Sequence, residues 1–157
     1  MKRKAEKITK SVPHQEHLNS SSFFSYEDLE SLLFPLIKET DIILENECGI
    51  DPILTHIINH TGELHAIDSS ETIINYLKNK HANIQFKTNL SEYQSNSFNL
   101  IIDRNACNNI LTSTTYTQKQ QIYHMKKLFK NVIDLLHSTI ISYFILICYI
   151  HPHSGEF

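Results

Sequence analysis

Hydrophobic residues recur along this 157-residue chain in two alternating patterns. Short apolar runs, each ended by polar residues, predict strands that are buried on both faces. Apolar positions spaced three and four residues apart predict helices that pack one face against those strands. The predicted strands cover 41–45, 64–68, 84–86, 98–103 and 139–150.

The helices predicted between these strands begin at recognisable capping residues. Ser25 and Asp28 resemble a capping box, and Pro35 is expected to tighten or kink the last turns of that helix because proline lacks a backbone donor. Asp51-Pro52 predicts a second start, with an N-cap followed by proline. Ser69–Ser70 can cap a third helix.

A long amphipathic helix is predicted over 117–137, with Lys126, Lys127 and Lys130 on its solvent side. Its inner face is predicted from six apolar positions: Ile122, Met125, Phe129, Val132, Ile133 and Leu136. Before it, asparagines at 105, 108 and 109 predict a polar loop around Cys107. The apolar run 139–150 is shorter than the ~20 residues a bilayer requires, so it predicts a buried strand.

The alternation of strands and helices predicts an α/β fold: a Rossmann-like, doubly wound, mostly parallel sheet with helices on both faces. In such sheets ligands bind at the carboxyl ends of the strands, near the point where the strand order reverses. Residues 1–22 are polar and basic and predict a disordered tail, which leaves 23–157 as the folded domain.

Composition narrows the function classes. The chain is 41% hydrophobic and 20% charged with a net charge of −3, which is ordinary for a globular domain and makes nucleic-acid binding unlikely. The basic residues of the first ten are the exception, and nuclear targeting or RNA contact is the less favoured explanation for them. Three widely spaced cysteines predict a reducing, cytoplasmic setting. His56 and His60 form the only clean i,i+4 histidine pair, and no cysteine or carboxylate stands in zinc-motif spacing around it, so no metal site is expected. No membrane association is expected either.

Polar residues at strand ends are the candidates for a site. The turn Glu45–Asp51 contains a single glycine, Gly49, and leads into a helix, where a ligand can approach the backbone. Asp68 ends the second strand about 20 residues later, where an acid can accept hydrogen bonds from ribose hydroxyls. The alternatives are an ordinary strand-to-helix turn and a helix cap at Asp68. Asn89, after the third strand, suits an adenine edge or a turn, and Asp103 ends the fourth strand facing the expected crevice.

The order of these pieces, from Ser25 to about 157, resembles class I S-adenosylmethionine-dependent methyltransferases. It is similar in particular to the branch that includes lysine methyltransferases of translation elongation factors. The segments that carry the resemblance are Ser25–Leu29, Leu32-Leu33, Pro35–Ile37, Cys48-Gly49, Ala66–Asp68, Asn96–Asp103 and His151–His153.

This resemblance implies S-adenosyl-L-methionine as the cofactor and assigns roles to seven positions. The methionine part of the cofactor would contact the turn after the first strand, the ribose the end of the second, and adenine the end of the third. The acid after the fourth strand would lie beside the methyl group and the acceptor. In this order the positions are Glu45, Cys48, Gly49, Asp68, Ser69, Asn89 and Asp103.

The chain departs from the family pattern at several of these places. Glu47 replaces the first turn glycine, Asp51 stands where a small residue is common, and Asn89 replaces an acid. Arg104–Asn109 replaces the family's Lys-Gly-Thr-Leu-Asp segment, and the family's last two strands are expected to be missing. A glutamate side chain at 47 is expected to hinder close approach to the turn.

Two functions remain open. The first is an S-adenosylmethionine-dependent methyltransferase, with a protein lysine as the acceptor. The alternative is a catalytically inactive relative that binds a partner protein, for which an exposed edge of the fifth strand would be a natural pairing site. A dehydrogenase is disfavoured because the chain has no GxGxxG turn.

Overall fold

The computed structural model of the chain describes residues 26–57, 62–139 and 141–147. The predicted tail 1–22, the Ser25 cap and parts of the second predicted helix and last predicted strand lie outside the described residues.

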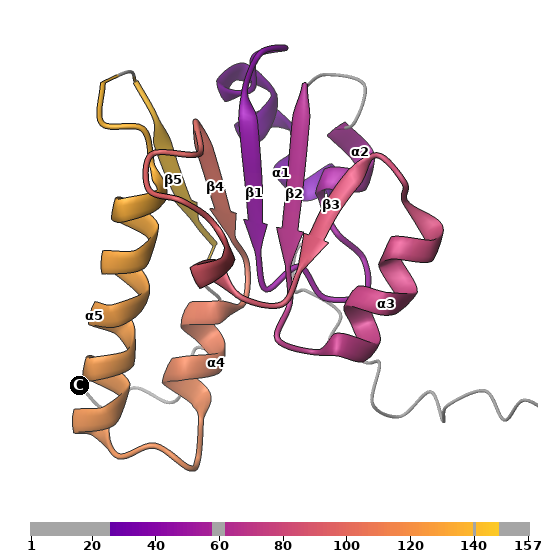
Figure 1. The fold of residues 1–157 in the computed structure, drawn as a ribbon. Helices are drawn as coiled ribbons and strands as arrows, with labels where there is room; N and C mark the ends of the chain where they lie inside the picture. Colours follow the sequence, from indigo (N-terminus) through magenta and orange to yellow (C-terminus); the bar gives the residue numbers. More distant parts are fainter. Residues whose placement is uncertain (1–25, 58–61, 140, 148–157) are drawn as a thin grey trace, which may run out of the picture.

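The described residues form a parallel five-stranded sheet with strand order β3-β2-β1-β4-β5, flanked by helices (Figure 1). The strands are β1 (Ile42–Asn46), β2 (Glu63–Ile67), β3 (Ile84–Lys87), β4 (Leu100–Asp103) and β5 (Tyr143–Leu146). The helices and 3₁₀ turns are α1 (Tyr26–Leu33), η2 (Phe34–Leu36), α2 (Leu54–Ile57), α3 (Glu71–Lys80), η3 (Leu90–Glu92), α4 (Ala106–Thr112) and α5 (Gln118–Leu135). The predicted Rossmann-like fold is therefore confirmed. The strand order reverses between β1 and β4, so a crevice is expected at their carboxyl ends.

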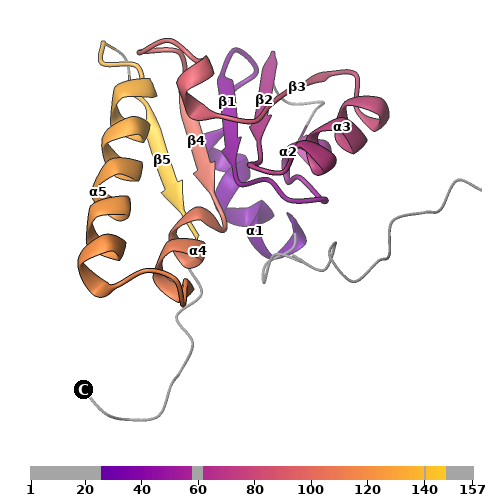
Figure 2. The ribbon, with the colours of Figure 1, turned by 60° about the horizontal axis from the view of Figure 1, so that its bottom comes forward.

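The sheet is covered on both faces by separate hydrophobic clusters. Ile43 and Ile102 pack with α1, α2 and α3, whereas Leu44 and Ile101 pack with α4 and α5. Figures 1 and 2 show the same division, with α4 and α5 on the opposite side of the sheet from α1. Because successive side chains of a strand point to opposite faces, strands buried on both faces are apolar over most of their length, with polar residues such as Glu45 and Asp103 near their carboxyl ends. This explains the continuous apolar runs of the sequence.

One helix end and one helix start agree with the sequence prediction, and one helix start differs from it. Pro35 lies in the 3₁₀ turn η2 that follows α1, as expected for a tightened end, and Ser70 caps α3 by accepting from the backbone N–H of Ile73. The prediction that Asp51 caps the second helix is wrong. That helix begins at Leu54, and the buried carboxylate of Glu45 accepts from its first N–H groups.

The segment after β4 was predicted as a loop and is a helix, α4. Its start is fixed by Asp103, whose Oδ1 accepts from the backbone N–H of Ala106 at 3.0 Å. A carboxylate at a helix N-terminus satisfies backbone donors that otherwise lack partners. Asparagine content alone did not indicate this, because the cap comes from the preceding strand.

The inner face of α5 is rotated relative to the prediction. Leu128, Val132 and Leu135 are its buried residues, whereas Ile133 is 67% exposed and Ile122 50% exposed. Ile122 and Ile133 were therefore wrongly assigned to the inner face, while Lys126, Lys127 and Lys130 are exposed as predicted. No helix among the described residues combines the length and apolarity needed to cross a membrane.

The last strand differs from its prediction in burial. Within the described part of 139–150, β5 has four residues, and Tyr143 and Leu146 are 40% and 37% exposed. The reason is position: in the described sheet β5 pairs with β4 and forms an edge. An edge strand buries less side-chain surface than a central strand.

Two alanine substitutions on α5, one of a buried leucine and one of an exposed isoleucine, test the corrected inner face. Leu135→Ala should lower the free energy of unfolding by about 2–5 kcal/mol, because it leaves a cavity in the core. Ile133→Ala should change it by less than about 0.5 kcal/mol, because that side chain is exposed. Urea unfolding of both variants measures the difference, and equal losses would contradict the assigned face.

Candidate functional site

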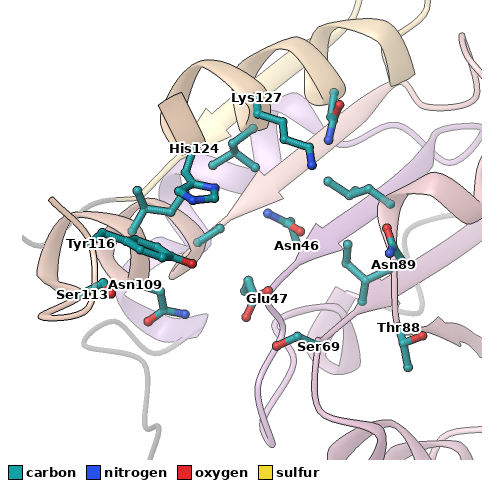
Figure 3. A pocket seen from close by; sticks show the side chains of 16 residues that line it. Asn46, Glu47, Ser69, Thr88, Asn89, Asn109, Ser113, Tyr116, His124 and Lys127 are labelled. Carbon is teal, nitrogen blue, oxygen red and sulfur yellow. The ribbon is translucent and has the colours of Figure 1, made fainter. Parts of the chain in front are cut away.

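A cavity of about 470 Å³ lies at the carboxyl ends of β1, β2 and β3, between the sheet and the helices α4 and α5 (Figure 3). Cavities of roughly 300–1,000 Å³ are the size that small-molecule ligands and cofactors use. Ten lining residues are labelled in Figure 3: Asn46, Glu47, Ser69, Thr88, Asn89, Asn109, Ser113, Tyr116, His124 and Lys127. We call this cavity the strand-end pocket.

Glu45 lies beneath the turn that borders this pocket and is fully buried. Its two carboxylate oxygens accept from the backbone N–H groups of Ile53 and Leu54, each at 3.1 Å. The guanidinium of Arg104 lies 2.7 Å from the same carboxylate. Burial raises the pKa of Glu45, and Arg104 and the two backbone donors oppose that rise. The described geometry therefore shows Glu45 holding the start of α2, away from the pocket lining.

Arg104 also binds the turn itself. Its Nη2 donates to the carbonyl oxygen of Cys48 at 3.1 Å and to that of Asp51 at 2.7 Å. One buried side chain from the end of β4 thus fixes the turn that follows β1, which includes Gly49. The sequence analysis noted Arg104 only as a departure from the family pattern.

Gly49 and Asp68 contact each other, but neither is among the residues that line the strand-end pocket. The backbone N–H of Gly49 donates to Asp68 Oδ2 at 3.0 Å, and Asp68 Oδ1 accepts from the N–H of Ser70 at 2.8 Å. Gly49 has φ 63°, a left-handed conformation that favours glycine. The second contact shows that the alternative role of Asp68, at the start of α3, is also present. Ser69, between these contacts, lines the pocket.

Cys48 contributes backbone to this turn, while its side chain belongs to the core on the α1–α3 face. Its N–H donates to the carbonyl oxygen of Ile67 at 2.9 Å, which ties the turn to the end of β2. Burial raises the pKa of the Cys48 thiol well above its ordinary value. A raised pKa disfavours the thiolate, which is the nucleophilic form of cysteine.

Asn89 lines the pocket at the end of β3 and also forms the local turn. Its Oδ1 accepts from the N–H of Ser91 at 2.9 Å, and Glu92 completes a capping box for η3. The structure therefore shows the turn role that the sequence left open for this position, and the adenine contact stays a prediction.

Asp103 is fully buried behind the pocket wall. It accepts from Asn46 Nδ2 at 2.6 Å through Oδ2 and from the N–H of Ala106 through Oδ1. Burial raises the pKa of Asp103, and these hydrogen bonds oppose that rise. Asn46 and Ala106 line the pocket, so Asp103 positions two lining residues.

Glu47 is the carboxylate that lines the pocket at the turn after β1. Its φ is 52°, a left-handed conformation that non-glycine residues seldom adopt, at the position where the resemblance expects glycine. Burial, then Asp68, then Asp103, raise the pKa of Glu47 to about 7. Among the described residues, no group of three His, Cys, Asp or Glu side chains is arranged to hold a metal ion.

The far wall of the pocket comes from α4 and α5, which the sequence analysis did not assign to a site. The rings of Tyr116 and His124 stack there with centroids 4.4 Å apart, and Lys127 lies one turn further along α5. The sequence pattern that indicates this wall is a row of residues on one face of α5 at helical spacing: His124, Lys127, Leu128 and Asn131. The lysines had been assigned to solvent, which concealed this row.

Comparison with known proteins supports the fold. The structure of the YcgJ protein from Bacillus subtilis matches with a TM-score of 0.58 at 14% identity, over 78% of this chain and 50% of that one. A TehB-like SAM-dependent methyltransferase from Corynebacterium glutamicum matches with a TM-score of 0.52 at 16% identity, over 69% and 55%. Phosphoethanolamine N-methyltransferase 1 from Haemonchus contortus, in complex with phosphoethanolamine and S-adenosylhomocysteine, matches with 0.54 at 14%, over 78% and 25%.

These similarities show that the chain shares the fold of S-adenosylmethionine-dependent methyltransferases. The chain spans about half the length of the first two structures and a quarter of the third. No protein-family model and no curated protein sequence matches it.

The buried ion pair is tested by removing one partner. Arg104→Met should lower the free energy of unfolding by about 3–5 kcal/mol, because it leaves the Glu45 carboxylate buried without its cation. Lys130→Met, which removes an exposed cation from α5, should change stability by less than about 0.5 kcal/mol. The Glu45→Gln/Arg104→Met double variant should lose less free energy of unfolding than the sum of the losses of the two single variants. Similar urea midpoints for Arg104→Met and Lys130→Met would contradict the role of the pair.

The raised pKa of Glu47 predicts a pH-dependent stability. Between pH 4.5 and about 7, Glu47 keeps a proton in the folded state that it releases in the unfolded chain. The stability that this proton contributes is present at low pH and is lost as the pH rises through 7. The side chain of the Glu47→Gln variant cannot ionise. The free energy of unfolding of this variant, relative to that of wild type, should therefore rise by about 2–3 kcal/mol between pH 4.5 and pH 8. Glu39→Gln, an exposed carboxylate before β1, is the control. A constant difference between Glu47→Gln and wild type across this range would refute the shift.

Proposed function

We propose that the strand-end pocket binds S-adenosylmethionine and that the protein transfers its methyl group to an acceptor. The observation that supports this most is the position of the pocket. It lies at the strand ends next to the β1–β4 switch point, and it brings Glu47, Ser69 and Asn89 to one 470 Å³ cavity. Ligands of open α/β sheets bind at this edge.

The residues present suit an adenosyl group. Asn89 and Leu90 offer a polar and an apolar contact at the end of β3, where adenine would lie. At the end of β2, Ser69 lines the pocket and offers a hydroxyl for the ribose, and the carboxylate of Asp68, buried beside it, would be the second ribose contact. Asp68 is already bonded to two backbone N–H groups, and a carboxylate can accept about four hydrogen bonds, so it retains capacity for hydroxyl donors.

The bound sulfonium would supply the reactive methyl group, so the protein's part is binding, orientation and exclusion of water. Asp103 would act by holding Asn46 and Ala106 in the pocket wall, and we assign it a positioning role. The resemblance found in the sequence adds an acceptor, a protein lysine, and the widely spaced cysteines add a cytoplasmic setting. Tyr116, His124 and Lys127 form the wall that such an acceptor would meet.

Cofactor binding is tested by thermal unfolding with S-adenosylmethionine or S-adenosylhomocysteine. At 100 times the dissociation constant, ligand should stabilise the wild type by about 2.7 kcal/mol. Ser69→Phe should abolish the shift, because the ring would fill the pocket at the end of β2. Ser31→Phe, at an exposed position of α1, should retain it.

Transfer is then measured as methylation of lysate proteins with methyl-labelled cofactor. Labelled lysine that depends on wild type and is lost in Ser69→Phe supports the full proposal. Cofactor binding without labelled product would instead favour the inactive, partner-binding alternative. Absence of any shift in folded wild-type protein would contradict cofactor binding and transfer together.

A further inference from the structure

Glu47 differs from the other carboxylates at this edge of the sheet in what its side chain meets. Glu45 is bonded to Arg104 and α2, and Asp103 to Asn46 and α4. Asp68 is bonded to the turn and to α3. Glu47 lines the pocket, and Figure 3 shows it on the pocket side of the turn, near Ser69. A ligand at the β1 end of the pocket would therefore meet this carboxylate.

The order of the strands decides which part of an adenosyl ligand lies there. With adenine at the end of β3 and ribose at the end of β2, the group on the ribose 5′ carbon points toward the ends of β1 and β4. In S-adenosylmethionine and S-adenosylhomocysteine that group ends in an amino-acid carboxylate. Glu47 stands at this end, with Asp68 and Asp103 close enough to act on it electrostatically.

We propose that Glu47 sets which adenosyl compounds the pocket accepts: a ligand with an amino-acid carboxylate binds together with one proton, whereas an adenosyl thioether without that carboxylate binds without one. This inference rests on the proposed function. The proton comes from solvent and resides on Glu47 in the complex, where the protonated carboxyl can donate a hydrogen bond to the ligand carboxylate. Two ionised carboxylates in the same partly buried space would repel each other.

The surroundings of Glu47 support a proton rather than a cation as the partner. The charged groups that act on it come from β2 and β4, Asp68 and Asp103, and both raise its pKa. Burial raises the pKa of the Cys48 thiol, next to it in the turn, which disfavours a charge there. On the opposite wall α5 supplies Lys127 and His124. Because His124 is a second ionisable group in the pocket, its contribution to any pH dependence has to be measured separately.

The experiment compares S-adenosylhomocysteine with 5′-methylthioadenosine, which has the adenosyl thioether but no amino-acid tail. Calorimetric titration from pH 6 to 8.5 gives both affinities, and buffers of different ionisation enthalpy give the protons taken up. For wild type, S-adenosylhomocysteine affinity should fall about tenfold per pH unit above pH 7, with close to one proton taken up at pH 8. Methylthioadenosine affinity should change less than about twofold over the same range.

Matched variants locate the proton. Glu47→Gln should remove the pH dependence for S-adenosylhomocysteine and leave methylthioadenosine binding unchanged, whereas His124→Gln and Glu39→Gln should keep the wild-type slope. Equal pH dependence for the two ligands, or a slope that survives in Glu47→Gln, would overturn the role of Glu47 while leaving cofactor binding intact. Failure of both ligands to bind wild type and Glu47→Gln at pH 6 would overturn the proposed function, and the role of Glu47 with it.

Discussion

The contact between Arg104 and Glu45 is the interaction on which the site depends. It joins the end of β4 to β1, and the same guanidinium holds two carbonyl oxygens of the turn between β1 and α2. A buried ion pair adds little net stability in general, because desolvation offsets the attraction. Here its value is geometric: it fixes a turn with two left-handed residues, Glu47 and Gly49, in a chain with only three glycines.

The carboxylates at the strand ends divide into two groups because of this arrangement. Those that hold the backbone accept from N–H groups or are bonded to Asn46 or Arg104, and they build the start of α2, α3 and α4. Glu47 belongs to the other group, since it lines the pocket and its pKa is raised to about 7. An ionisable carboxyl group is thus present in the wall of the site as well as beneath it, which distinguishes this pocket from one formed by a glycine turn.

The fold could be predicted from the sequence because the strands are continuous apolar runs and helix caps are local. The approach of Gly49 to Asp68 was also predictable, since both follow adjacent parallel strands. The function of Glu45 was not, because its partner Arg104 lies on another strand. The start of α4 could have been recognised, because Asp103 accepts from Ala106 only three residues further along the chain. The inner face of α5 could not, because it depends on how that helix meets the sheet. Contacts between distant segments leave no local pattern.

The stacked pair of Tyr116 and His124 has an optical consequence. The chain contains seven tyrosines and no tryptophan, so tyrosine dominates its ultraviolet emission. Tyr116 lies in the pocket wall with an imidazole against its face. Its fluorescence is therefore sensitive both to the charge of that imidazole and to any molecule that enters the space beside it, which gives the protein an intrinsic reporter of pocket occupancy without an added label.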